Sequence, residues 1–98
     1  MNRKVSFHEL AEGELNDAAV FFEIERVGLG VRFLSTVEAT VTYIQQHPEA
    51  SPIITHNVRR KVLRGFPFSI MYSINPERIR ILAIANQRRR PFYWRGRE

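Results

Sequence analysis

Hydrophobic residues recur at helical spacing in the first half of the chain. Four of them fall at i, i+3, i+4 and i+7, which places them on one face of a helix. They are Leu15, Ala18, Ala19 and Phe22. The acidic side chains nearby lie largely off this stripe, on the face expected to meet water: Glu12, Glu14, Asp17, Glu23 and Glu25. The pattern predicts an amphipathic helix.

A second helical pattern follows after a short break. Its apolar positions are Phe33, Leu34, Val37, Val41 and Ile44. Gly28 and Gly30 flank the break, where glycine takes the positive φ that ends a helix at little cost. Pro48 and Pro52 end the second pattern because proline has no amide hydrogen to continue a helix. Two amphipathic helices with a short connection predict an antiparallel hairpin.

After a loop expected at residues 48–57, the hydrophobic period changes from that of a helix to that of a strand. In residues 68–74 the even positions are all large and apolar. Ser69, Met71 and Ser73 occupy the other face. This alternation predicts a half-buried strand, because successive side chains of a strand point to opposite faces.

Three further segments are candidate strands. Residues 79–85 are apolar on both faces, which predicts an interior strand, while residues 58–64 and 4–7 have weaker patterns. The order β-α-α-β-β-β predicts an α+β fold, with a short N-terminal strand and a two-helix hairpin packed on one face of a small, mostly antiparallel C-terminal sheet. We expect the other face to be free and the basic segments to end there.

The composition narrows the class of protein. With 98 residues, we expect residues 1–98 to form a single domain. The chain has no cysteine, which excludes disulfides, zinc–cysteine sites and thiol nucleophiles. His8, His47 and His56 lack carboxylates at metal-ligand spacing, so we expect no metal and no other cofactor. No apolar run approaches the ~18 residues of a membrane span, and we expect a cytoplasmic protein without a membrane partner.

Charge is unevenly distributed along the chain. Residues 1–55 hold four basic and eight acidic side chains, whereas residues 56–98 hold eleven basic and two acidic ones. The second part therefore carries a formal charge of +9, against −4 in the first. This imbalance predicts a polyanionic partner, either nucleic acid or an acidic protein segment. The alternative is a charged face that serves solubility alone.

Three basic clusters lie in the second part of the chain. They are Arg59, Arg60, Lys61 and Arg64; Arg88, Arg89 and Arg90; and a C-terminal tail in which Phe92, Tyr93 and Trp94 are followed by Arg95 and Arg97. Guanidinium groups bind phosphate and aromatic rings stack on unpaired bases, so the mixture favours single-stranded RNA over duplex DNA. We expect the Trp94 side chain to pack the tail against the sheet through hydrophobic contacts. For Tyr93, packing against the sheet and stacking on an RNA base both stay open.

Four segments resemble the RelE/ParE superfamily of toxins, also called plasmid-stabilisation proteins. The first is the helix pattern in residues 14–22, and the second is the glycine-containing junction in residues 28–33. The third is RGFPFSIMY at residues 64–72, and the fourth is ILAIANQRRRP with the following YW in residues 81–94. The resemblance covers nearly the whole chain. It implies the toxin component of a bacterial type II toxin–antitoxin system, with the α+β fold predicted above.

The resemblance implies two possible targets. RelE-like members cleave mRNA on the ribosome without metal, using basic residues and a C-terminal tyrosine, whereas ParE-like members inhibit DNA gyrase without catalysis. Ribosome-dependent mRNA cleavage is our leading hypothesis, gyrase inhibition is the alternative, and a degenerate module that only binds an antitoxin is the third. Under each hypothesis we expect an antitoxin whose acidic, flexible C-terminal segment covers the basic surface and the free sheet edges.

The family's functional residues carry over in part. Tyr93 falls where the C-terminal tyrosine is expected, and Arg88 and Arg89 lie in the segment after the last strand, so these three are the candidate catalytic residues. The candidate RNA- or phosphate-binding residues are Arg59, Lys61, Arg64 and Arg90. Ser69 and Gln87 stand where the family pattern has arginines. Loss of a fixed guanidinium beside a phosphate commonly lowers the rate of cleavage ~100-fold.

Overall fold

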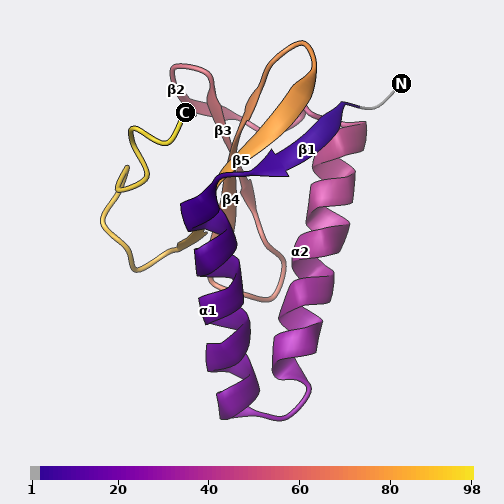
Figure 1. Cartoon of the computed structure of the whole chain (residues 1–98), viewed down its shortest axis with the longest axis vertical. Helices are drawn as coiled ribbons and strands as arrows, with labels where there is room; N and C mark the ends of the chain where they lie inside the picture. Colours follow the sequence, from indigo (N-terminus) through magenta and orange to yellow (C-terminus); the bar gives the residue numbers. More distant parts are fainter. Residues whose placement is uncertain (1–2) are drawn as a thin grey trace.

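The computed structural model describes residues 3–98, and its elements follow the predicted order with one additional strand (Figure 1). They are β1 (Lys4–Phe7), α1 (Glu9–Glu25), α2 (Leu29–Gln46), β2 (Ile53–Thr55), β3 (Val58–Val62), β4 (Phe68–Ile74) and β5 (Arg78–Asn86). The strands form one sheet in the order β1-β5-β4-β3-β2, in which β1 and β5 are parallel and the other neighbours antiparallel. The predicted α+β fold is confirmed.

The two helices form a hairpin, but Gly30 has a different role from the one expected. α1 ends at Glu25 and α2 begins at Leu29. Gly28, with φ of +90°, lies in the break as predicted, whereas Gly30 lies inside α2. A Cβ atom on Gly30 would lie only 2.5 Å from the carbonyl oxygen of Ala19. Glycine is required at this position because the two helix backbones approach closely.

Both helices cover the same face of the sheet (Figure 1). The even positions of β4 pack against them, and Phe68, Ile70 and Tyr72 are at most 7% exposed. Phe22 of α1 and Phe33 of α2 meet above this strand, with ring centroids 5.1 Å apart. Each of these two rings also contacts Phe68. A cluster of aromatic rings therefore joins the hairpin to the sheet.

β5 is an interior strand with a bulge, and the bulge explains why its sequence is apolar on both faces. Met71 of β4 pairs with Ala83. The next residue, Tyr72, pairs with Ile81, so Leu82 has no partner on β4. An extra residue of this kind interrupts the alternation of side chains between the two faces of the sheet, so two successive residues, Leu82 and Ala83, point to the same face. The buried side chains of β5 are Ile79, Ile81 and Ile84 on the helix side, and Leu82, Ala83 and Ala85 on the opposite side.

The face opposite the helices is not free, which corrects our expectation. The C-terminal segment, residues 87–98, follows β5 and packs over this face through Trp94, which is 2% exposed. The indole lies in a cluster with Met71 and Leu82. Burial of a side chain of this size contributes on the order of 2–3 kcal/mol to holding the segment on the sheet. The expected packing of Trp94 against the sheet is confirmed.

Residues 48–57 contain the additional strand in place of an uninterrupted loop. β2 has only three residues, and it pairs with the start of β3. Arg59 fixes the preceding segment, because its guanidinium donates to the backbone oxygens of Glu49 (3.0 Å) and Ser51 (2.7 Å). Three residues are too few to show an alternating pattern, so sequence reasoning missed this strand.

Candidate functional site

An open cleft of about 500 Å³ lies between α1 and the segment that follows β5. Apolar side chains of α1, β4 and β5 line much of it. The polar residues around the cleft differ in charge: Glu14 and Asp17 belong to α1, whereas Arg88 and Arg89 follow β5. Tyr93 also lines the cleft, so the structure brings together the three candidate catalytic residues.

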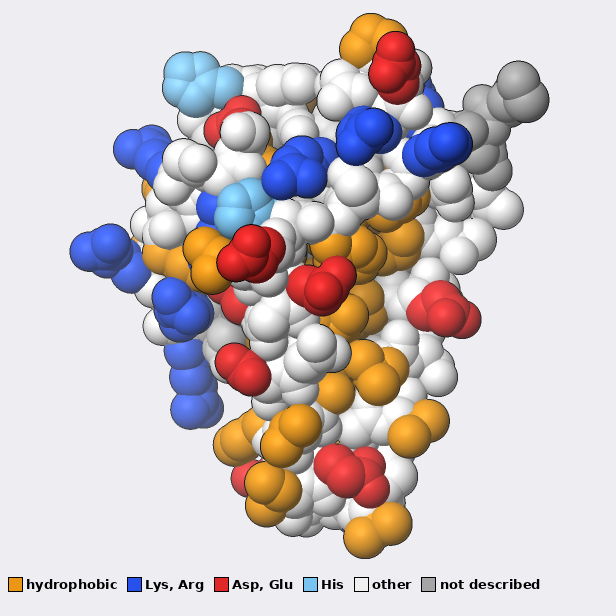
Figure 2. Space-filling model, viewed as in Figure 1, with side chains coloured by type: hydrophobic (Ala, Val, Ile, Leu, Met, Phe, Trp, Pro, Cys, Tyr) orange, Lys and Arg blue, Asp and Glu red, His pale blue; other side chains and the backbone are white. Residues whose placement is uncertain are grey.

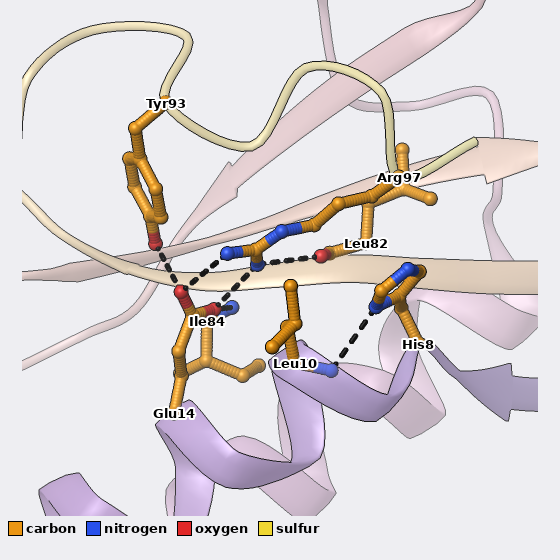
Figure 3. A network of polar contacts seen from close by, with 7 residues as sticks. All are labelled: His8, Leu10, Glu14, Leu82, Ile84, Tyr93 and Arg97. Carbon is orange, nitrogen blue, oxygen red and sulfur yellow. Dashed lines mark hydrogen bonds and ion pairs between the residues drawn. The ribbon is translucent and has the colours of Figure 1, made fainter.

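Glu14 is the centre of a polar network between α1 and the C-terminal segment (Figure 3). Its carboxylate accepts hydrogen bonds from the Tyr93 hydroxyl (2.8 Å) and from the two terminal nitrogens of Arg97 (3.0 and 3.1 Å). It also accepts one from the backbone N–H of Ile84 (3.0 Å). The Glu14 and Arg97 side chains are 16% and 11% exposed, so this ion pair is largely shielded from water.

Sequence reasoning placed Glu14 on the wet face of its helix and missed this role. The residue directly precedes Leu15, at the border of the apolar stripe. A carboxylate at such a border can turn toward the core. This border position is the one sequence signal that could have indicated a buried role for Glu14. Its partners Tyr93 and Arg97 lie 79 and 83 residues away in the sequence, so no local pattern connects them.

The Tyr93 hydroxyl is a hydrogen-bond donor to a carboxylate and a poor acid in this arrangement. Burial raises the pKa of this hydroxyl above its ordinary value of 10.0, and the hydrogen bond from the hydroxyl to Glu14 and the negative charge of Glu14 raise it further. Arg89 and Arg97 act in the opposite direction, with guanidinium carbons 3.9 and 5.1 Å from the ring centroid. The hydroxyl therefore keeps its proton at neutral pH and donates it in the hydrogen bond to Glu14.

A second hollow lies on the sheet face opposite the helices, beside the C-terminal segment. Arg60, Arg89 and Arg90 line it, together with Tyr93 and Ser69. Ser69, which stands where the family pattern has an arginine, is 4% exposed. Three guanidinium groups around one hollow are suited to binding a phosphate or another anion.

The other predicted phosphate-binding residues lie elsewhere. Arg59 is engaged with the segment before β2. Lys61 lies on the helix side of the sheet, where its Nζ is 4.8 Å from the centroid of the Tyr43 ring on α2. Arg64 lines the same surface as Lys61. Because neighbouring residues of a strand point to opposite faces, the sheet separates Lys61 from Arg60. The basic clusters of the sequence therefore do not form one site.

The histidines have no common role in the structure. His8 precedes α1, and its Nδ1 accepts a hydrogen bond from the backbone N–H of Leu10 (3.0 Å), which caps the helix. Within residues 3–98, no group of three histidine, aspartate or glutamate side chains is placed to hold a metal ion. In that same range, none of the helices has the length and apolar character needed to cross a bilayer.

Comparison with known proteins identifies the fold. No family model matches the sequence, and no curated protein matches it. A chain of the chromosomal ParDE TA (toxin–antitoxin) system from P. aeruginosa has a similar structure, with a TM-score of 0.76 and 18% sequence identity. The match covers 86% of the present chain and 95% of that chain. The protein therefore has the fold of a ParDE toxin–antitoxin chain, as its resemblance to the RelE/ParE superfamily predicted.

Proposed function

We propose that this protein is the toxin of a type II toxin–antitoxin pair. The observation that carries the proposal is the fold, which it shares with 95% of a ParDE chain. The formal charge of +9 in residues 56–98 supports it, because an antitoxin with an acidic segment would complement this positive charge. Expression from a tight inducible promoter should arrest bacterial growth, and co-expression of the adjacent gene should restore it. Normal growth with abundant protein would contradict the proposal.

The geometry around Tyr93 favours gyrase inhibition over mRNA cleavage. Cleavage requires transfer of a proton to the leaving 5′-oxygen. The Tyr93 hydroxyl is instead bound to Glu14 at 2.8 Å, and its pKa is raised. Ser69 supplies no guanidinium to stabilise the negative charge that develops on the phosphate. An inhibitor that acts by binding gyrase needs neither group.

mRNA cleavage, the leading hypothesis from the sequence, is the second candidate. The specific observation in its favour is that Arg60, Arg89 and Arg90 line one hollow on the sheet face opposite the helices. Two measurements in the same arrested culture separate the candidates. Intact transcripts with accumulated double-strand breaks indicate gyrase inhibition, whereas rapid translation-dependent cleavage of transcripts indicates a nuclease.

Two substitutions then test chemistry at this site. For a nuclease, Tyr93→Phe keeps the ring but removes the hydroxyl, and it should lower cleavage ~10–1,000-fold. Arg89→Ala should weaken RNA binding and reduce the slope of log affinity against log salt by about 0.7. For a gyrase inhibitor both variants should still arrest growth. Tyr43→Phe, at a partly exposed tyrosine outside the cleft, is the control for loss of a hydroxyl.

A further inference from the structure

α1 carries a second apolar surface, on the side away from its buried stripe. Val20 and Ile24 are four residues apart and Phe21 and Ile24 three, so the three side chains are neighbours on the helix. Val20, Phe21 and Ile24 are 60%, 57% and 81% exposed. Val27, in the connection to α2, is 91% exposed and extends the surface to the tip of the hairpin. We call these four residues the outer face of α1, and Figure 2 shows hydrophobic side chains gathered at this end of the hairpin.

The outer face is large for an apolar surface that stays in water. Side chains of this size belong to residues with total areas of about 150–200 Å², so the exposed fractions leave roughly 500 Å² on each copy of the chain. The largest apolar patch of a typical monomer is ~300–600 Å² and is often functional. Two outer faces in contact would bury about 1,000 Å², before flanking side chains are added, which reaches the lower limit of a specific protein interface.

The charges around the outer face disfavour an anionic occupant. Asp17 lies on the same side of α1, because it is three residues before Val20 and four before Phe21. Glu23 and Glu25 are the sequence neighbours of Ile24, and both are exposed. These carboxylates would repel nucleic acid and an acidic protein segment. The outer face therefore needs an apolar partner that also brings positive charge.

A second copy of the chain supplies both when two α1 helices pack antiparallel. Asp17 lies on one side of the apolar residues, and Arg26, which caps the end of α1, lies on the other. Within residues 3–98 the one ion pair joins Glu14 and Arg97, so Asp17 and Arg26 have no ion-pair partner in their own copy. A twofold axis midway between residues 20 and 24 brings each Asp17 to within about 2 Å of the level of Arg26 in the other copy, at a rise of 1.5 Å per residue. Parallel packing would instead place Asp17 against Asp17.

We propose that the outer face of α1 is a twofold interface between two copies of this chain. The two helices pack antiparallel, with Val20 of each copy against Ile24 of the other and an Asp17–Arg26 ion pair at each end. The same surface is used on both copies, so the assembly closes at two chains. Phe21 also lines the cleft beside Glu14, so the second copy covers that end of the cleft. An interface of this size corresponds to a dissociation constant of about 1–100 µM.

The first experiment measures self-association of the purified full-length protein by sedimentation equilibrium between ~1 and ~500 µM. The parent should change from the mass of one chain to that of two as its concentration rises. The outer-face variant carries Val20→Gln and Ile24→Gln, which keep a good helix propensity and add no charge. The matched control carries Ile53→Gln and Val62→Gln, at apolar residues of β2 and β3 that are 55% and 49% exposed.

The dimer of the outer-face variant should be at least about tenfold weaker than that of the control, because each substitution acts twice in a symmetric dimer. Circular dichroism at low concentration should give the same spectrum for both variants and the parent. A second variant with Val20→Ala and Ile24→Ala keeps the helix by a different route, since alanine has the highest helix propensity. It should also weaken the dimer.

The second experiment tests the antiparallel arrangement by reversal of charges. Asp17→Arg places two cations together at each end of the interface, and Arg26→Glu places two carboxylates together there. Each single variant should weaken the dimer about threefold to tenfold, as expected for two exposed ion pairs. The double variant restores opposite charges and should return to within about threefold of the parent. In a parallel dimer the double variant would show no such recovery.

Three results would overturn the proposal: the mass of one chain at every concentration, equal dissociation of the outer-face and control variants, or no recovery in the charge-reversed double variant. If the protein is a monomer and the outer-face variant instead loses binding to the product of the adjacent gene, the face belongs to that protein and the proposal fails. The mass measurements do not use growth arrest. A monomer that arrests growth would refute this interface alone, and a dimer that does not arrest growth would refute the toxin function alone.

Discussion

Replacement of Glu14 by glutamine tests whether the network around it holds the C-terminal segment in place. Glutamine has nearly the same size, and its side-chain oxygen can still accept the hydrogen bond from the N–H of Ile84. The substitution removes the negative charge paired with Arg97 at 3.0 Å. The same side-chain oxygen can still accept from Nη1 of Arg97, which also donates to the backbone oxygen of Leu82 (3.1 Å), but Nη2 of Arg97 loses its acceptor and the guanidinium keeps no negative partner.

The expected loss of stability follows from the shielding of the ion pair. Removal of one partner from a buried pair costs ~3–5 kcal/mol, whereas an exposed pair contributes ~0–1 kcal/mol. Glu14 and Arg97 are 16% and 11% exposed, which is close to buried, and the remaining contact with water lowers the loss to about 2–3 kcal/mol. For a domain of this size, such a loss lowers Tm by about 10–20 °C.

Trp94 provides a reporter for the C-terminal segment, because it is the only tryptophan in the chain and is 2% exposed. Thermal unfolding followed by circular dichroism gives Tm. Iodide quenching of tryptophan emission, measured well below Tm, gives the accessibility of the segment. In Glu14→Gln, quenching should increase before the helices and sheet unfold. Asp17→Asn is the control, since Asp17 is exposed on the same helix, and it should change stability by no more than about 0.5 kcal/mol.

A Glu14→Gln protein with the Tm and iodide quenching of the parent would refute this reasoning. It would mean that the network contributes no more than an exposed ion pair. A double-mutant cycle with Arg97→Gln gives an independent measure, and we expect a coupling energy of at least about 1 kcal/mol between the two side chains.

Two further predictions concern alkaline pH and the helix contact. The folded state raises the pKa of Tyr93 above its ordinary value of 10.0, so the stabilisation it provides is complete below about pH 10 and is lost as the pH rises further. The free energy of unfolding, measured with urea at several alkaline pH values, should therefore fall more steeply in the parent than in Tyr93→Phe, and equal slopes would exclude this contribution. Gly30→Ala should destabilise the protein by ~1–3 kcal/mol, because the new Cβ would lie 2.5 Å from the carbonyl oxygen of Ala19. Gly13→Ala, where no atom lies within 4 Å of the added Cβ, should stabilise it by about 0.5–1 kcal/mol, and the opposite order of these two variants would exclude the close approach.

Local periodicity by itself determined the two helices and the strand at residues 68–74. The apolar stripes at helical spacing became α1 and α2, and the alternating residues 68–74 became β4 with the predicted bounds. This worked because the hydrophobic period is set by the geometry of a single helix or strand and needs no knowledge of distant residues. The charge imbalance between residues 1–55 and 56–98 was also a property of the sequence alone.

Only the tertiary structure decided which charged residues lie together. Arg60 and Lys61 are neighbours in the sequence but lie on opposite faces of the sheet, and the irregular alternation of residues 58–64 did not reveal which face each would take. Glu14 acquires its partners because α1 packs beside β5 and the C-terminal segment returns to it across 79 residues of sequence. The cleft and the network around Glu14 therefore depend on contacts between distant segments, which no local pattern encodes.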